Sequence, residues 1–198
     1  MCLYLTDPTV DEEVKARHLN RYMTAIAFVC HSGGKWLDAA CGSGYGTFLM
    51  AEYADVVYGM DRDKEAIEYA RQHYQPPVDE FVHRDILVPN LDPLFGNFDV
   101  ILSVETIEHL NQKAQMAWIR KVGTELMGPS GVFVVTTPIR KGGGPNPLNP
   151  KHLWEPDKEE LLAMLRLYFT QAHTLEHRTP MTTGEEQLNL YVRCERLS

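Results

Sequence analysis

The feature that most constrains the fold of this chain is a short apolar run that ends in an acidic residue and leads directly into a glycine-rich turn. The run ends in Asp38, and Gly42, Gly44 and Gly46 follow at alternate positions before a helical pattern begins. A strand, a tight loop and the start of a helix, in this order, bring the backbone close to a nucleotide-like ligand. The sequence therefore predicts an α/β unit with a ligand site where its first strand ends.

A second acidic residue supports the same site. Residues 56–60 form another apolar run, and Asp61 follows it directly. A carboxylate at the tip of the second strand can accept hydrogen bonds from both hydroxyls of a ribose. Together the two features predict an adenosine-type cofactor that lies across the ends of neighbouring strands.

Size and composition favour one soluble globular domain over residues 1–198. The chain has 44% hydrophobic and 23% charged residues, an ordinary balance for a domain with a full core. No apolar stretch reaches the roughly 20 residues that span a bilayer, and residues 1–8 lack the basic segment of a signal peptide. The net charge of −8 disfavours non-specific binding to nucleic acid. Scattered cysteines without a C-x-x-C pair argue against zinc and disulfide frameworks and favour a cytoplasmic location.

Helical and strand patterns alternate along the chain. Helical patterns cover residues 10–30, 44–53, 63–74, 113–126 and 157–168, and strand patterns cover residues 35–40, 56–60, 80–83, 98–103, 131–137, 172–177 and 188–194. The alternation predicts a mainly parallel sheet with helices on both faces, and the last two strands predict an antiparallel hairpin at one edge. Residues 138–150 hold four prolines and three consecutive glycines, which predicts a long loop above the sheet. We expect residues 138–156 to act as a lid.

The spacing of the glycines favours one class of cofactor. The pattern G-x-G-x-G is one residue shorter than the dinucleotide pattern. The Asp38 carboxylate would also be costly beside a pyrophosphate, whereas it would be favourable beside an ammonium and a sulfonium. The loop therefore favours S-adenosylmethionine over a nicotinamide dinucleotide.

At this point the chain resembles the class I S-adenosylmethionine-dependent methyltransferases over most of its length. The matching segments are residues 37–46, 58–61, 83–87, 98–110 and 131–138. The resemblance implies a Rossmann-like, seven-stranded, mostly parallel sheet with an antiparallel last strand. It also implies that the helix within residues 1–31 lies over the cofactor. The likeness is to the type that acts on small molecules and glycans, including the ubiquinone-pathway O-methyltransferases.

The resemblance implies roles for individual residues. The glycine loop would wrap the methionine part of the cofactor and Asp61 would hold the ribose, while Asp85 would face the adenine amino group and Ile86 would flank the ring. The expected cofactor-binding residues are Asp38, Ala39, Cys41, Gly42, Gly44, Tyr45, Asp61, Arg62, Asp85, Ile86, Ser103 and Glu105.

Several of these residues have a purely structural alternative. The glycines could simply turn the chain, and Asp61 could cap the next helix, although Asp63 is better placed for that. Asp85 could be only a turn former. Asp38 could orient the loop amides without touching the ligand, and Cys41 is expected to be a small residue beneath it.

The catalytic groups are expected just after the fourth parallel strand, within residues 103–109. Methyl transfer mainly requires alignment and exclusion of water, and a base helps when the acceptor is a hydroxyl. His109 is the candidate base because its pKa lies near neutral pH, and Glu105 is expected to line the methionine end. The alternative is that His109 is a packed, hydrogen-bonded histidine at a helix end.

A metal site is the less favoured interpretation of the same region. Glu105, Glu108 and His109 form an E-x-x-E-H run, and His152 could add a fourth ligand. A similar quartet binds a divalent metal in the small-RNA 3′-end methyltransferases, but the run also occurs in the small-molecule type. The surroundings of His152 look more like the latter, so no metal is expected.

The sequence thus predicts a methyltransferase that uses S-adenosylmethionine on a small-molecule acceptor. Oxygen of a glycan, nucleotide-sugar or natural product is the expected target, and Arg21, Tyr22, His152 and Trp154 are the candidate substrate residues. Tyr22 and Arg21 could instead belong to an ordinary helix face, and Trp154 could be plain core. The alternatives are a metal-assisted RNA ribose 2′-O-methyltransferase and a non-catalytic, cofactor-binding partner subunit. Neither a membrane partner nor an oligomeric state is indicated.

Overall fold

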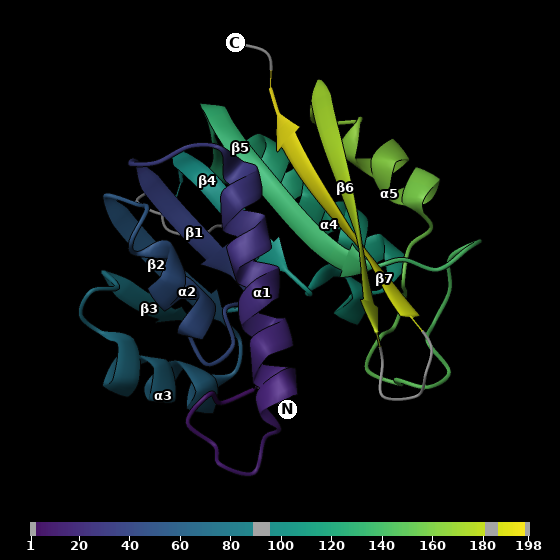
Figure 1. Cartoon of the computed structure of the whole chain (residues 1–198). Coiled ribbons are helices and arrows are strands. Elements are labelled where there is room, and N and C mark those ends of the chain that lie inside the picture. Colours follow the sequence, from purple (N-terminus) through teal and green to yellow (C-terminus); the bar gives the residue numbers. More distant parts are fainter. Residues whose placement is uncertain (1–2, 89–95, 181–185, 197–198) are drawn as a thin grey trace.

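The computed structural model describes residues 3–88, 96–180 and 186–196, and predictions that fall on the remaining residues lie outside it. In the described residues a seven-stranded sheet runs through the molecule in the order β3-β2-β1-β4-β5-β7-β6 (Figure 1). The strands are β1 Lys35–Ala39, β2 Val56–Asp61, β3 Glu80–His83, β4 Phe98–Val104, β5 Met127–Pro138, β6 Gln171–Pro180 and β7 Glu186–Glu195. The helices are α1 Glu12–Val29, α2 Tyr45–Met50, α3 Lys64–Tyr74, α4 Gln112–Lys121 and α5 Lys158–Leu165, with a 3₁₀ turn η1 Ile107–His109 and a π-turn η2 Val122–Leu126.

The pairing of the strands confirms the predicted fold class. β1 pairs in parallel with β2 and β4, and β3 and β5 extend the parallel part on either side. β7 runs antiparallel to both β5 and β6, so the closing hairpin lies at one edge and β6 is the edge strand. The carboxyl ends of the parallel strands consequently meet at one end of the sheet, where α/β proteins place their ligand sites.

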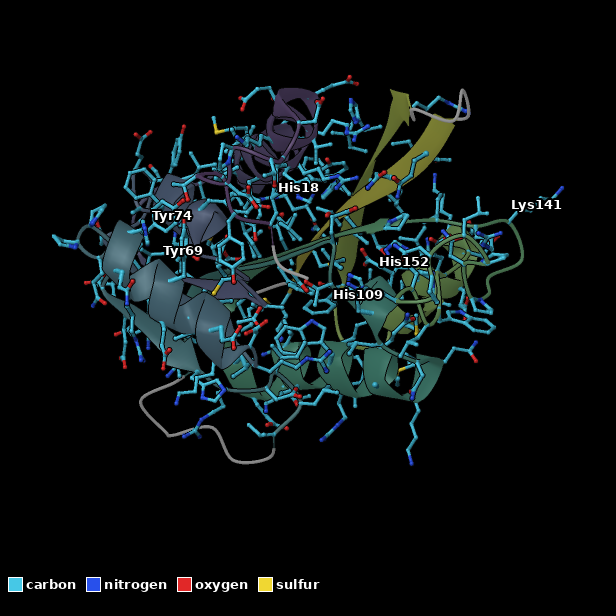
Figure 2. The ribbon with its side chains drawn as sticks, turned by 90° about the horizontal axis from the view of Figure 1, so that it is seen from below. His18, Tyr69, Tyr74, His109, Lys141 and His152 are labelled. Carbon is cyan, nitrogen blue, oxygen red and sulfur yellow. The ribbon has the colours of Figure 1, made fainter. Side chains whose placement is uncertain are left out.

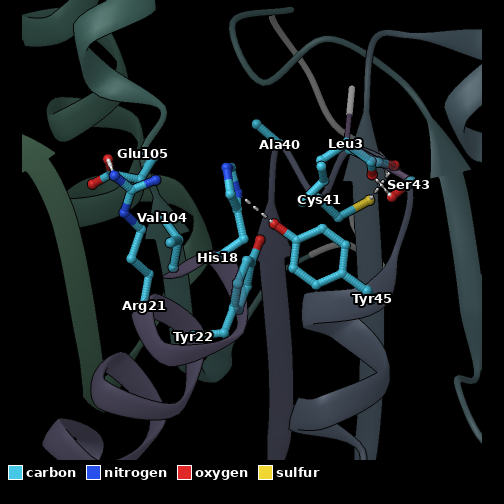
Figure 3. A pocket seen from close by; sticks show the side chains of 11 residues that line it. Leu3, His18, Arg21, Tyr22, Ala40, Cys41, Ser43, Tyr45, Val104 and Glu105 are labelled. Carbon is cyan, nitrogen blue, oxygen red and sulfur yellow. Dashed lines mark hydrogen bonds and ion pairs between the residues drawn. The ribbon is translucent and has the colours of Figure 1, made fainter. Parts of the chain in front are cut away.

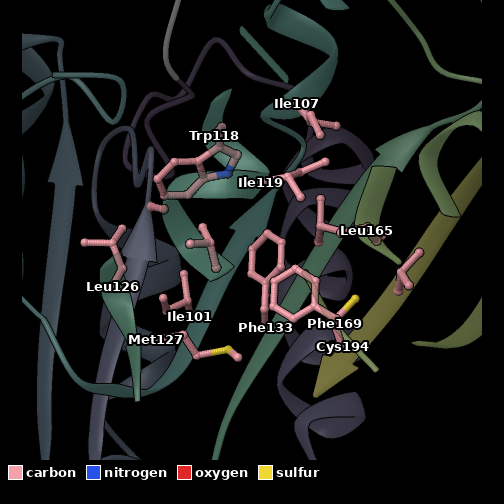
Figure 4. Packing of buried hydrophobic residues seen from close by; sticks show 14 of the residues in the cluster. Ile101, Ile107, Trp118, Ile119, Leu126, Met127, Phe133, Leu165, Phe169 and Cys194 are labelled. Atoms are coloured by element: carbon pink, nitrogen blue, oxygen red, sulfur yellow. The ribbon is translucent and has the colours of Figure 1, made fainter. Parts of the chain in front are cut away.

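Both faces of the central strands are buried, and alternate residues of these strands belong to different cores. In β5, Val132 and Val134 pack with α1 and α2, while Phe133 and Val135 pack with α4 and α5. Figure 4 shows the second core, in which Phe133 lies beside Phe169 under Trp118 and Ile119. Burial on both faces explains why the sequence of this strand is an uninterrupted apolar run.

The structure shifts several predicted boundaries. The helix predicted over residues 10–30 begins at Glu12, because the Asp11 side chain accepts a hydrogen bond from Glu13 N, and it ends at a left-handed Cys30. β5 starts earlier than predicted. Residues 128–131 look like a turn in the sequence, but they form an irregularity where the pairing shifts from Phe98–Met127 to Val100–Val132.

Among the described residues, none of the helices combines the length and the apolar character needed to cross a bilayer.

Candidate functional site

Two adjoining cavities lie where the parallel strands end. The larger has a volume of about 570 Å³ and the smaller about 130 Å³, and both are lined by Ala40, Gly42 and Glu105. The larger cavity is also lined by Asp61, Arg62, Asp63, Asp85, Ile86, Thr106, His109, Leu110, Lys151 and Leu153. The smaller is also lined by Leu3, His18, Arg21, Tyr22, Cys41, Ser43, Tyr45 and Val104. Nine of the residues predicted for cofactor binding or catalysis therefore line these spaces: Cys41, Gly42, Tyr45, Asp61, Arg62, Asp85, Ile86, Glu105 and His109.

Asp61 ties the glycine loop to the next strand. One of its carboxylate oxygens accepts a hydrogen bond from Gly42 N at 2.8 Å, and the other accepts one from Asp63 N at 2.8 Å. The N-cap of α3 is Asp63, whose side chain accepts from Glu65 N and Ala66 N. Asp61 is therefore not the N-cap of that helix, and it lies in the wall of the larger cavity.

Asp85 both forms a turn and lines the larger cavity, which are the two roles considered for it from the sequence. Its carboxylate accepts a hydrogen bond from Leu87 N at 2.8 Å, as in an ordinary aspartate turn. The residue nevertheless lines the larger cavity together with Ile86. A carboxylate oxygen has more than one acceptor site, so the turn leaves room for a ligand donor.

Asp38 lies behind the glycine loop, which differs from its predicted direct contact with the cofactor. It is fully buried and accepts hydrogen bonds from Thr47 Oγ1 at 2.7 Å and Tyr22 Oη at 3.1 Å. Burial raises its pKa from the usual 3.8 to about 7. Asp38 therefore links β1 to α1 and α2 through hydrogen bonds to side chains. Among the described residues, the hydrogen-bond partners of its carboxylate are these side chains and not the backbone amides of the glycine loop, and it is not among the residues that line the two cavities.

Three other predicted cofactor residues also lie outside the cavity walls. Ala39 and Ser103 are fully buried, and Ser103 Oγ accepts a hydrogen bond from Trp118 Nε1 at 3.3 Å. Gly44 has a positive φ of 88°, and a Cβ there would lie 2.6 Å from Ala70 Cβ. At Gly44 a side chain is excluded by the packing of the loop against α3 and β3. A small residue required by packing cannot be distinguished in the sequence from one required by a ligand.

Helix α1 supplies one wall of the smaller cavity (Figure 3). Arg21 Nη2 lies 3.5 Å from Glu105 Oε2. His18 Nδ1 lies 3.1 Å from Tyr45 Oη, and burial lowers the pKa of His18 to about 4, so this imidazole is neutral near pH 7. Sequence reasoning missed His18, although it shares a helical face with Arg21 and Tyr22 at i+3 and i+4.

Glu105 is held by contacts from several elements. Its φ is +50°, a strained value for a residue with a side chain and one that recurs at functional sites. Its N–H donates to the Thr136 carbonyl at 3.0 Å, and its Oε1 accepts from Thr136 Oγ1 at 3.1 Å and from Asn189 Nδ2 at 2.8 Å. The side chain is thus fixed at the boundary of the two cavities, facing Arg21.

Glu108, His109 and His152 lie close together, and His109 also lines the larger cavity. One ligand-type atom from each side chain lies within 4.8 Å of the other two. The rings of His109 and His152 are 5.0 Å apart and nearly perpendicular, and Figure 2 shows them side by side. Burial raises the pKa of Glu108 well above its usual value and lowers that of His109. Glu105 is not a member of this cluster, in contrast to the quartet considered from the sequence.

The segment predicted as a lid is fastened around one carboxylate. Glu155 accepts hydrogen bonds from His152 Nδ1 at 2.7 Å and Asn146 Nδ2 at 2.6 Å. Trp154 does not wall the cavity as predicted, because its Nε1 donates to the Glu160 carboxylate at 3.1 Å. The side chains that this segment adds to the larger cavity are Lys151 and Leu153, and sequence reasoning had selected neither.

Comparison with known proteins decides the family. A family model described as "Methyltransferase domain" matches residues 37–127. A probable S-adenosylmethionine-dependent methyltransferase of Mycolicibacterium smegmatis is 35% identical over 137 residues, which are 68% of this chain and 51% of that protein. The chain belongs to the class I S-adenosylmethionine-dependent methyltransferases. S-adenosylmethionine is the cofactor of that family.

The chain is also similar to methyltransferases with a named pathway. It is 28% identical over 131 residues to a ubiquinone biosynthesis O-methyltransferase of Psychrobacter arcticus, covering 65% of this chain and 50% of that one. The chain spans about half the length of these curated relatives.

Solved structures show that the fold is widely shared. The N-methyltransferase NodS of Bradyrhizobium japonicum, bound to S-adenosyl-L-homocysteine, superposes with a TM-score of 0.73 at 15% identity over 96% of this chain and 90% of that chain. The [4+2]-cyclase SpnF superposes with a TM-score of 0.71 at 14% identity over 100% of this chain and 88% of that chain. Because a protein named as a cyclase has the same fold, the function of this methyltransferase-family chain must be argued from its site.

Proposed function

We propose that this chain transfers a methyl group from S-adenosylmethionine to an oxygen of a small-molecule acceptor such as a glycan, a nucleotide-sugar or a natural product. The supporting observation is the pair of adjoining cavities with Glu105 at their boundary. A volume of about 570 Å³ falls within the range of small-molecule sites, roughly 300–1,000 Å³. The lining of the larger cavity includes the carboxylates of Asp61 and Asp85 as well as His109, Leu110 and Leu153.

The charges of the site suit the proposed cofactor. Asp61 and Asp85 offer carboxylate acceptors for the ribose hydroxyls and the adenine amino group. In the smaller cavity, Arg21 and Glu105 offer one charge of each sign. An amino-acid end carries a carboxylate and an ammonium, so it can pair with both. We therefore assign the methionine end of the cofactor to the smaller cavity.

The acceptor would lie between His109 and the segment of residues 138–156. When bound, the cofactor supplies an activated methyl group on a sulfonium, which is a good leaving group. His109 Nδ1 lies 3.0 Å from the Lys151 carbonyl, which can only accept, so Nδ1 carries the proton and Nε2 keeps its lone pair. Nε2 would accept the acceptor's hydroxyl proton as the oxygen–carbon bond forms and the carbon–sulfur bond breaks. Leu110 and Leu153 would exclude water from this space.

The net charge of −8 argues against an RNA acceptor. The other alternative is that the chain binds the cofactor without catalysis, as a partner subunit. The following experiment distinguishes this alternative from methyl transfer. Incubation with methyl-labelled S-adenosylmethionine and a panel of hydroxyl-bearing small molecules should give labelled product. Cofactor binding without transfer to any acceptor in the panel would favour the non-catalytic role.

His109→Ala tests the assignment of the acceptor side. We expect turnover to fall by roughly 100-fold or more, the usual scale for loss of a general base. Binding of S-adenosylmethionine, measured by calorimetry, should remain near the unmodified value. The matched control is His173→Ala on the exposed edge strand β6, which should leave both quantities unchanged. Equal losses of turnover and cofactor binding in His109→Ala would argue against the base role.

A further inference from the structure

The segment that follows β5 is basic, although the chain as a whole is acidic. The chain has 27 acidic and 19 basic residues, yet residues 126–154 contain no aspartate or glutamate and include Arg140, Lys141 and Lys151. Four acids from other segments line the larger cavity: Asp61, Asp63, Asp85 and Glu105. The carboxylates of the cavity therefore come from the ends of β2, β3 and β4, and a cation comes from the segment after β5.

The three cations of this segment have different surroundings. Arg140 Nε lies 3.3 Å from Glu155 Oε2, so the charge of Arg140 is balanced within the protein. Lys141 is exposed, and Figure 2 shows its side chain directed away from the body of the molecule. Lys151 lines the larger cavity, and no carboxylate of the described residues forms an ion pair with it. The ammonium of Lys151 is therefore available to an anion that enters the cavity.

The cavity lining contains a second basic side chain, Arg62, whose surroundings differ from those of Lys151. Arg62 lies between Asp61 and Asp63 in the chain, and both of these acids line the same cavity. The charge of Arg62 is therefore offset by its neighbours. Lys151 has no acidic neighbour in the chain closer than Glu155, which is already engaged by Arg140 and His152.

The backbone of Lys151 is held beside the proposed base. His109 Nδ1 donates to the Lys151 carbonyl at 3.0 Å, and the Lys151 N–H donates to Asn149 Oδ1 at 3.3 Å. The side chain of Lys151 consequently begins next to the imidazole that would take the acceptor's proton. An acceptor bound at His109 would lie close enough for a second group on it to reach this lysine.

Apolar surface accompanies this cation in the cavity. Leu153 is 51% exposed although it is a large apolar residue, and it lines the cavity together with Leu110. An ion pair is stronger where apolar groups keep water away from it. A cation and apolar side chains in one lining suit a ligand that has both an apolar part and a negative charge.

We propose that the acceptor carries an anionic group, a carboxylate or a phosphate, that pairs with the ammonium of Lys151. This inference rests on the proposed function, and it narrows the acceptor to anionic compounds whose apolar part contacts Leu110 and Leu153. The ion pair would hold the acceptor with its hydroxyl near His109 Nε2, while the carboxylate of the cofactor pairs with Arg21. Lys151 takes no part in the transfer of the methyl group, so it determines specificity and is not a catalytic residue.

Small aromatic probes test the ion pair without a known acceptor. The protein, saturated with S-adenosyl-L-homocysteine so that the cofactor site is occupied, is titrated by calorimetry with phenyl phosphate, benzoate and neutral benzyl alcohol. We expect the two anions to bind roughly 5- to 10-fold more tightly than the alcohol, the scale of one partly screened ion pair. Added salt should reduce the difference. Lys151→Met, which keeps the length but removes the charge, should abolish it, and Lys151→Arg should retain it.

The matched control is Lys141→Met, which removes the same charge from the same segment outside the cavity. It should keep the preference for anions, and circular dichroism identifies any variant that loses its fold. The proposal is overturned if the wild-type protein binds benzyl alcohol as tightly as phenyl phosphate, or if folded Lys151→Met still prefers the anions.

The acceptor panel provides a second test. Lys151→Met should raise KM for anionic acceptors roughly 5- to 10-fold with little change in kcat, because it removes binding and leaves the base in place. An equal rise in KM for neutral acceptors would overturn the proposal. Methyl transfer that fails with every acceptor, while the binding of phenyl phosphate still depends on Lys151, would contradict the proposed function and support the ion pair.

Discussion

At the scale of single residues, Asp61 combines a structural and a proposed ligand-binding role. Its two oxygens hold Gly42 N and Asp63 N, and the residue faces the larger cavity. Asp61→Asn keeps the size of the side chain but removes its charge. We expect the dissociation constant for S-adenosylmethionine to rise roughly 10- to 100-fold, because charge-assisted hydrogen bonds contribute about 1.5–3 kcal/mol. Calorimetric titration measures the change.

The control is Asp63→Asn, which removes the same charge from a neighbouring position in the same cavity wall. Asparagine is a good N-cap, so α3 should be retained. We expect less than about a three-fold change in the dissociation constant, which is about 0.65 kcal/mol and below the roughly 1.5–3 kcal/mol of a hydrogen bond to a charged group. Equal effects of the two variants would mean that only the net charge of the cavity matters, and the ribose assignment would fail.

Asp38 leads to a prediction about pH. Its pKa is raised to about 7 in the folded protein and is about 3.8 when exposed, so between these values the folded protein retains a proton that the unfolded chain has released. Stability therefore falls as pH rises through this window, with a slope of at most about 1.4 kcal/mol per pH unit. Asp38→Asn should flatten that fall. Denaturant unfolding from about pH 5 to about pH 7 measures the difference, and parallel profiles for the two proteins would contradict the buried, protonated Asp38.

At the scale of elements, the glycine loop is set by the packing of helices as much as by a ligand. A Cβ on Gly46 would lie 2.1 Å from the ring of Tyr22, so α1 can approach α2 only because this residue is glycine. Gly46→Ala should cost about 1–3 kcal/mol through overpacking. This loss would occur although alanine favours helix by about 1 kcal/mol. Denaturant unfolding measures the change.

A double-mutant cycle identifies the clash. Tyr22→Ala should remove most of the additional cost of Gly46→Ala, whereas Tyr22→Phe keeps the ring and should not. Additive effects of Gly46→Ala and Tyr22→Ala would show that the glycine is required for another reason.

At the scale of the whole molecule, the fold was predictable because the two sequence patterns that indicate it each involve only residues that are near one another in the chain. Apolar runs separated by helical patterns indicate a parallel sheet, and two final strands without a helix indicate a hairpin. The site was less predictable, since the direction of a side chain depends on contacts between distant elements. Asp38 points behind the loop, and Asn189 reaches Glu105 from a strand 84 positions away along the chain. His109 and His152 meet because the segment after β5 folds back onto η1.

Calorimetric titration of the purified chain with S-adenosylmethionine is the most direct test of the proposed cofactor site. One binding site per chain is expected, with a dissociation constant on the order of micromolar. Its demethylated product, which carries the same adenosine and amino-acid ends, should compete for the same site. Failure to bind either compound at millimolar concentration, together with measurable binding of NAD, would contradict the assignment.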